Sequence, residues 1–223
     1  MAVRQRARND EDKQARRAAI LEHAALLIEG HPYAKITMAQ VARACGLAKG
    51  TLYLYFRSKE ELFLALVEQE LVAWFDALLD ALGQLPSVTA DAFGQHFAAS
   101  VAQRRTLREL LVILHTILEQ NVDSQTALTF KAVVRDKLLE GGAALEQVWP
   151  AIPAGAGTRT LLRIYALMVG LKQMAFPSDT VASVLSREDM KALRVDFQQD
   201  LAAGVADMLR GIERAANRER ARS

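Results

Sequence analysis

Residues 37–56 read TMAQVARACGLAKGTLYLYF, and this stretch decides how the N-terminal part of the chain folds. Thr37 followed three residues later by Gln40 has the form of a capping box. In such a box the threonine hydroxyl accepts from the backbone N–H three residues on, and the glutamine reaches back to the backbone N–H of the cap. The pattern therefore predicts that a helix starts at Thr37.

The same stretch contains the residues that a tight turn between two helices requires. Ala42 is small, so a second helix can cross close to the first, and Gly46 lies four residues further on. Glycine adopts the positive φ that most residues resist, which suits it to such a turn. We predict short helices over residues 37–44 and 48–56, joined by the turn at Gly46.

The side chains of this pair of helices separate into an apolar and a polar set. The apolar residues expected to join the two helices are Val41, Cys45, Leu47 and Leu52. The residues expected to face outward are Lys49, Gly50, Thr51 and Tyr53. This arrangement is typical of a helix-turn-helix whose second helix enters the major groove of DNA. The alternative is an ordinary pair of antiparallel helices with a glycine turn.

Charge is spread unevenly along the chain. Residues 1–60 hold 11 Lys and Arg against 6 Asp and Glu, a formal balance of +5, whereas the remainder holds 17 against 20, a balance of −3. A basic head on a mildly acidic body suggests that the head meets a polyanion, although a solvated charged face gives similar counts.

The single cysteine and the lengths of the apolar segments indicate in which cellular compartment the protein is expected. Cys45 is alone, so no disulfide can form within the chain, which fits a reducing environment. We interpret it as a small buried hydrophobe, with redox sensing as the alternative. No segment has the length that a bilayer span needs, and the N-terminus lacks the apolar stretch of a secretory signal. We therefore expect a soluble, cytoplasmic protein.

Helix caps and breaks divide the rest of the chain into further helices. Apolar periodicity and flanking Gly, Pro and Ser residues predict helices over residues 11–29, 58–82, 91–103, 106–120, 124–148, 158–175 and 186–215. No alternating strand pattern of useful length is present. The sequence thus predicts an all-α fold of about nine helices.

Leu47 to Phe63, LAKGTLYLYFRSKEELF, resembles the recognition-helix signature of the tetracycline-repressor (TetR) family of bacterial transcriptional regulators. The resemblance covers residues 13–68, and beyond residue 70 only the helical layout and the length match. It implies a three-helix helix-turn-helix domain over residues 1–60 and a helical effector-binding and dimerisation domain over residues 61–223.

The resemblance also implies which residues touch DNA. Phosphates would be contacted by Thr37, Tyr53, Tyr55 and Lys59. Bases and neighbouring phosphates would be approached by Lys49, Gly50 and Thr51. Tyr55 falls where such units often bury a residue, so packing is an equal alternative for it. Ala48 departs from the family, which often has Ser or Thr there, and so removes a hydroxyl contact or cap.

Two helices near the C-terminus have apolar stripes that fit a dimer face, as the family implies. The candidate interface residues are Leu161, Tyr165, Met168, Phe197, Leu201, Val205 and Met208. A palindromic operator requires a symmetric pair, because two recognition helices about 34 Å apart read successive major grooves. The alternative is that the stripes face the core of their own chain.

The middle helices would enclose an effector pocket in such a regulator. The candidate lining residues are Trp74, Phe97, His115, Phe130, Trp149, Tyr165 and Met168. Aromatic residues at helical spacing pack by default, so plain core is the alternative for each. His115 and Glu119 lie one helical turn apart, but two ligands do not make a metal site, and we expect no metal and no cofactor.

The sequence therefore predicts a DNA-binding transcriptional regulator, a homodimeric repressor released from a palindromic operator by a small, largely apolar effector. The alternative is a DNA-binding regulator without a small-molecule effector. The chain has no nucleophile elbow, zinc triad or P-loop in a recognisable frame, so we do not expect an enzyme.

Overall fold

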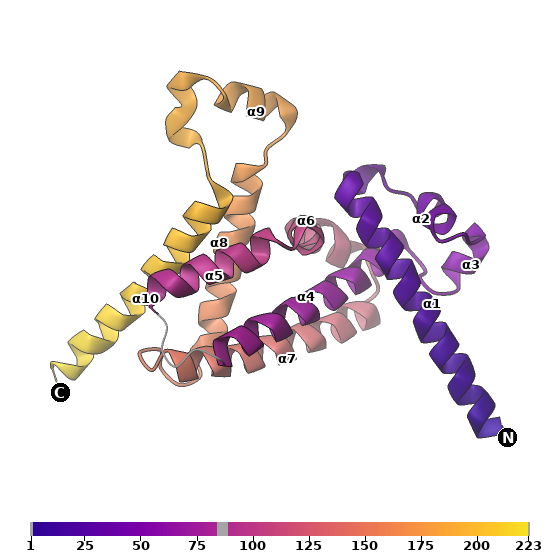
Figure 1. Cartoon of the computed structure of the whole chain (residues 1–223), viewed down its shortest axis with the longest axis horizontal. Helices are drawn as coiled ribbons and strands as arrows, with labels where there is room; N and C mark the ends of the chain where they lie inside the picture. The colour runs from indigo at the N-terminus through magenta and orange to yellow at the C-terminus, as the bar shows by residue number, and fades with distance from the viewer. Residues whose placement is uncertain (1, 84–88, 223) are drawn as a thin grey trace. The chain divides into compact units, whose positions relative to one another are not determined.

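The computed structural model describes residues 2–83 and 89–222, and this part of the chain is helical without any strand (Figure 1). The predicted all-α fold is thus confirmed, with ten α-helices in the described residues where about nine were expected. None of these helices combines the length and the apolar character that a bilayer crossing requires. The helices group into two compact units.

The first unit comprises residues up to Glu70 together with Glu109–Lys131. It contains α1 (Ala2–Gly30), the 3-10 turn η1 (Tyr33–Lys35), α2 (Met38–Ala44), α3 (Lys49–Tyr53), the first half of α4 (Lys59–Gly83), the end of α6 (Arg105–Ile113), the π turn η2 (Leu114–Leu118), the 3-10 turn η3 (Glu119–Asn121) and the start of α7 (Ser124–Val148). Its core includes buried side chains of α1 to α4, among them Ile20, Ala24, Val41, Leu52, Phe63 and Leu66, and of α6 and α7, among them Leu110 and Phe130. The predicted boundary at residue 60 stays a prediction.

The second unit comprises Leu71–Arg108 and Ala132–Ser223. Besides the remainders of α4 and α7 it contains α5 (Ala90–Ala102), α8 (Gly157–Ala175), α9 (Asp179–Leu185), the 3-10 turn η4 (Glu188–Leu193) and α10 (Phe197–Arg220). α5 lies against α10 (Figure 1). Their backbones approach so closely that a Cβ on Gly94 would collide with the Ala202 carbonyl.

The start of the last helix differs from the prediction. A helix over 186–215 was expected, but residues 188–193 form the 3-10 turn η4 and α10 begins at Phe197. Asp196 caps α10, because its carboxylate accepts from the Gln199 N–H at 2.9 Å while its own N–H donates to Asp200 at 2.9 Å. The short helix α9 was not predicted.

Two other helices differ at their ends. α1 starts at Ala2 rather than near residue 11. The predicted helix over 106–120 is α6 followed by the π turn η2 and the 3-10 turn η3, so its last two turns depart from α-helical hydrogen bonding.

Candidate nucleic-acid interface

α2 begins with the predicted capping box. The Gln40 N–H donates to the Thr37 hydroxyl at 3.3 Å, and the Gln40 side-chain carbonyl accepts from the Thr37 N–H at 2.8 Å. The Thr37 hydroxyl also donates to that carbonyl at 2.9 Å. Thr37 is exposed, but both its donors serve the cap, so a DNA phosphate would have to compete with Gln40 for them.

The turn between α2 and α3 has the predicted geometry. Gly46 has a φ of 65°, and the Leu47 N–H donates to the Ala42 carbonyl at 2.8 Å. Ala42 is buried where the helices meet. Cys45 is half-buried rather than fully buried, and burial raises the pKa of its thiol, which keeps the thiol protonated. The turn therefore sets the angle at which α3 leaves α2.

α3 presents one polar and one apolar face. Leu52 is fully buried, whereas Lys49 and Gly50 are exposed and Thr51 is half-buried. Tyr53 keeps 41% of its surface, and the Lys49 ammonium lies 5.8 Å from the centre of its ring. These side chains form an exposed basic and aromatic surface. As the departure at Ala48 suggested, no side chain caps the start of α3.

Gly50 is not required by the packing of its own chain. A Cβ built on Gly50 would meet no atom within 4 Å, and its backbone φ is not in the left-handed region. A glycine that neither turn geometry nor packing demands leaves room for a surface outside the chain to approach the backbone.

Lys59 turns inward from the start of α4. Its ammonium donates to the carbonyls of Tyr33 at 3.2 Å and Ile36 at 3.1 Å. Tyr33 in turn donates its hydroxyl to Glu60 at 2.8 Å and packs edge-on against Phe63. Burial, with help from the Glu60 carboxylate, raises the pKa of the Tyr33 phenol. The lysine thus fixes the loop before α2.

Sequence reasoning passed over exposed residues of the same region. Leu54 is 78% exposed directly after α3, and Arg43 is exposed on α2. Arg57, between α3 and α4, binds the carboxylates of Glu61 on α4 and of Asp123 just before α7. Tyr55 is half-buried, which leaves both of its interpretations open. Arg57 lies inside the stretch that resembles the family signature, but the sequence analysis gave it no role. Its position, a few residues after the predicted recognition helix, was the signal that could have singled it out.

Three of the proposed effector residues pack into one aromatic cluster of the second unit. Trp74 contacts Phe97 at 5.4 Å between ring centres, and Phe93 contacts both Phe97 at 6.1 Å and Trp149 at 5.9 Å. The indole N–H groups donate to Ser100 at 3.0 Å from Trp74 and to Glu213 at 2.6 Å from Trp149. Residues packed in this way form core.

The other effector candidates lie on α8 or in the first unit. Met168 is buried and Tyr165 half-buried on α8, while His115 and Phe130 belong to the first unit. His115 is exposed and bonds Glu119 at 3.1 Å. In the described part of the chain, no three His, Cys, Asp or Glu residues gather as a metal would need.

The candidate dimer residues lie mostly inside their own chain. The buried members are Leu161, Met168, Phe197, Leu201 and Val205, and the half-buried members are Tyr165 and Met208. Leu201 and Val205 have no exposed surface to offer a partner in this conformation. The exposed faces of the two helices carry other residues, including Leu162 at 37%, Ala166 and Ala203.

An N-terminal helix-turn-helix on a helical body defines a DNA-binding transcriptional regulator. Residues 20–66 match the family described as bacterial regulatory proteins, tetR family, and residues 68–216 match the tetracyclin repressor-like C-terminal domain. The chain belongs to the TetR family of transcriptional regulators.

Relatives and solved structures agree with this family. The HTH-type transcriptional regulator EthR of Mycobacterium tuberculosis is 31% identical over 145 residues, which span 58% of this chain and 64% of the relative. FadR from Bacillus subtilis in complex with stearoyl-CoA is 16% identical with a TM-score of 0.52, covering 86% of this chain and 96% of that one. AibR in complex with isovaleryl coenzyme A and operator DNA is 21% identical with a TM-score of 0.53, covering 86% and 97%. At these identities the two structures show the fold alone.

Proposed function

We propose that this regulator is a repressor that binds a palindromic operator as a homodimer and leaves it when a small, largely apolar effector occupies the helical body. The exposed surface of α3, with Lys49 and Tyr53 on one side and an unobstructed Gly50 between them, carries the proposal. The protein would act where the chromosome is, in the cytoplasm.

The DNA surface consists of residues that the first unit leaves exposed or half-exposed. Lys49 would bind a phosphate, and the bare backbone of Gly50 would let α3 approach the groove closely. Thr51 would lie near base edges, while the hydroxyls of Tyr53 and Tyr55 would donate to phosphates. Thr37 would join them through its exposed helix start. Lys59 we assign to positioning, because its ammonium holds two backbone carbonyls.

A second copy of the chain supplies the second recognition helix. Two half-sites bound together multiply a weak single affinity, and their spacing selects the palindrome. The exposed faces of α8 and α10, including Leu162 and Ala166 on α8 and Ala203 on α10, are the surfaces we propose for the pairing. The buried stripe behind them then stabilises the protomer.

The second unit offers apolar surface for an effector. An open groove of about 420 Å³ lies between α4 and α7, and its apolar lining residues include Leu79, Leu82, Ala144 and Val148. The aromatic cluster around Trp74 and Phe97 would line a pocket only if its rings moved apart. Because FadR and AibR hold acyl-CoA thioesters, acyl chains and their thioesters are the first compounds to try.

The effector would release the protein from the operator because it binds one conformer of the protein more tightly than the other. The effector favours the conformer it binds better, and operator affinity falls by no more than the ratio of its affinities for the two conformers. We would titrate a labelled fragment of the gene's own upstream region with the protein, then add stearoyl-CoA, isovaleryl-CoA or decanoic acid. Loss of the complex with one of them supports the proposal, and failure of the protein to bind the fragment in low salt rejects it.

The alternative is a regulator without an effector. Thermal unfolding distinguishes the two, because a ligand that binds only the folded state raises the melting temperature. A broad screen of apolar metabolites that neither stabilises the protein nor releases the DNA would favour the alternative.

A further inference from the structure

Arg57 occupies the turn that joins the recognition helix to α4. It follows the buried Phe56 and precedes Ser58, whose hydroxyl accepts from the Glu61 N–H at 3.0 Å. The Glu61 carboxylate accepts from the Arg57 backbone N–H at 2.8 Å and from its Nε at 3.2 Å. The stem of Arg57 is therefore held on α4, and the direction of its guanidinium is set.

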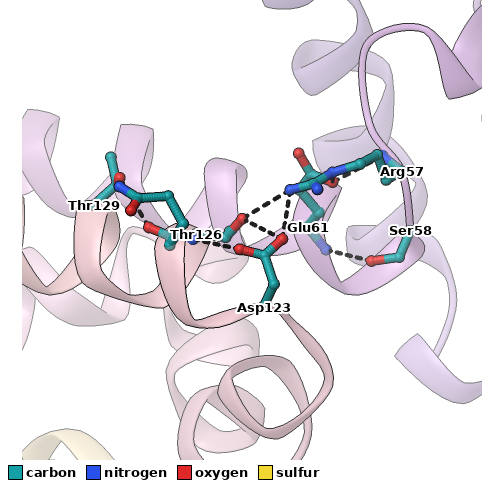
Figure 2. A network of polar contacts seen from close by, with 7 residues as sticks. Arg57, Ser58, Glu61, Asp123, Thr126 and Thr129 are labelled. Carbon is teal, nitrogen blue, oxygen red and sulfur yellow. Dashed lines mark hydrogen bonds and ion pairs between the residues drawn. The ribbon is translucent and has the colours of Figure 1, made fainter.

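The guanidinium reaches the start of α7, 66 residues further along the chain. Figure 2 shows Arg57 directed at Asp123, and the distance between its Nη2 and the Asp123 Oδ2 is 2.5 Å. The same nitrogen donates to the Thr126 hydroxyl at 3.2 Å, and that hydroxyl donates to Asp123 at 3.2 Å. One arginine thus joins the α3–α4 turn to the first turn of α7.

Asp123 also caps the start of α7. Its Oδ1 accepts from the Thr126 N–H at 2.9 Å, so it caps α7 while its Oδ2 receives Arg57. Its hydrogen bonds to Thr126 and the charge of Arg57 lower the pKa of the Asp123 carboxyl, so it is ionised at neutral pH. Any shift of the start of α7 must therefore move Asp123 relative to Arg57.

The pair is too exposed to matter much for stability. The Arg57 and Asp123 side chains are 69% and 46% exposed, and pairs in that environment contribute little to folding. α4 and α7 both continue from this unit into the second one. A weak link between a recognition helix and a helix that enters the effector-binding unit is suited to adjusting an orientation.

We propose that Arg57 and Asp123 are positioning residues that seat the α3–α4 turn on the start of α7, and that this seat raises operator affinity. The inference rests on the proposed function. Neither residue needs to touch a base. The seat holds α3 in the orientation that binds DNA, and a displaced α7 would release it.

The variant Asp123→Asn separates this seat from ordinary electrostatics. Asparagine caps helices as well as aspartate does, so α7 keeps its start while the ion pair is lost. Removing a negative charge near DNA would by charge alone tighten binding. The seat predicts the opposite sign, a weakening of about two- to fivefold, the range that exposed ion pairs reach.

The experiment measures fluorescence anisotropy of the upstream fragment with wild type, Asp123→Asn, Arg57→Gln and the double variant. Glu22→Gln, an exposed α1 residue outside the network, is the matched loss of one negative charge and should bind equally or more tightly. Asp123→Asn should weaken binding in the wild type but not in the Arg57→Gln background. If wild type binds and Asp123→Asn binds as tightly or more tightly, the seat is rejected.

A second readout does not depend on DNA. Amide hydrogen exchange of the free protein over residues 52–60 should be faster in Asp123→Asn than in wild type, and unchanged in Glu22→Gln. If wild type fails to bind the fragment while this difference is present, the proposed function fails, and the seat stands only as the contact that holds the α3–α4 turn on α7. If wild type fails to bind and exchange is unchanged, both fail.

Discussion

The ammonium group of Lys59 lies 3.9 Å from the centre of the Tyr33 ring and donates to the Tyr33 carbonyl oxygen 3.2 Å away. This contact joins the start of α4 to the loop before α2, although 26 residues separate the two. The lysine therefore holds the loop from which α2 begins, next to the surface that we propose binds DNA.

Replacing Lys59 tests that arrangement. Lys59→Met removes the ammonium donor from two part-buried carbonyls, of which that of Tyr33 keeps the Ile36 N–H, and this should lower the free energy of unfolding by about 1–3 kcal/mol. The dependence of operator affinity on salt should keep its slope. Lys49→Met is the contrast: its melting temperature should stay near that of wild type, while its slope falls by about 1.8, because each chain of the dimer loses one phosphate contact. A reduced slope for Lys59→Met would mean that it binds phosphate.

Gly50→Ala should separate stability from DNA binding. Because an added Cβ meets no atom within 4 Å, the methyl group fits, and the reduced freedom of the unfolded chain stabilises the fold by about 0.4–1 kcal/mol. The same methyl group lies on the surface proposed to approach DNA, so operator affinity should fall at least about fivefold, comparable with one lost base-pair contact. Thermal unfolding and anisotropy measure the two effects.

Gly46→Ala is the control for that experiment. Gly46 has a φ of 65°, a conformation that costs a residue with a side chain about 1–2 kcal/mol. This variant should lose stability where Gly50→Ala gains it. If Gly50→Ala also loses stability, the space around Gly50 is not open as described. If it binds DNA as well as wild type, Gly50 does not approach the operator.

The dimer is tested on the exposed face of α8. Leu162→Glu places a charge on a side chain that is 37% exposed, and should convert the dimer to monomers in light scattering, because an unpaired buried charge is costly at an interface. Leu139→Glu makes the same change on α7, where the leucine is 55% exposed, and should leave the dimer intact. A dimer that survives Leu162→Glu would place the interface elsewhere.

Glu68 gives the fold a pH dependence. Burial raises the pKa of its carboxyl, although the charge of Arg17 opposes this. A carboxyl with a raised pKa contributes stability below its unfolded pKa, and that contribution is lost as the pH rises through the folded pKa. Glu68→Gln should therefore melt higher than wild type at pH 7, by a margin that shrinks toward pH 4. A margin independent of pH would contradict this.

Local chemistry made the helix-turn-helix predictable. The capping box of Thr37 and Gln40 and the turn at Gly46 each depend on residues within a few positions, so their geometry follows from the sequence. The outward position of Lys49 follows from the apolar spacing of the same stretch. These are the features on which the family resemblance also depends.

The prediction failed at the start of α10, where a contact outside the helix-cap pattern determines the structure. Ser186 and Asp196 both have the local pattern of a helix cap, and only Asp196 caps a long helix. The guanidinium of Arg194 donates to the carbonyls of Leu185, Ser186 and Arg187 at 2.7–2.9 Å, which closes the segment between α9 and α10. Nothing in the local pattern indicates that contact.

The apolar stripe of α10 was predictable, but its partner was not. Periodicity shows that one face is buried and does not say against what. Leu201 and Val205 are buried within their own chain, where α5 lies against α10, and the close approach at Gly94 depends on a residue more than a hundred positions away. Their burial is what the alternative of a stripe facing its own core predicts, and their place in a dimer interface stays a prediction.

The most direct measurement is the affinity of the protein for its own upstream region as a function of salt, for wild type and for Lys49→Gln. We predict specific binding that weakens steeply with salt, with two chains per site, and a variant whose slope is smaller by about 1.8, about 0.9 for each chain, at unchanged thermal stability. Equal binding to unrelated DNA, or a slope that Lys49→Gln leaves untouched, would contradict the assignment of α3 as the surface that binds the operator.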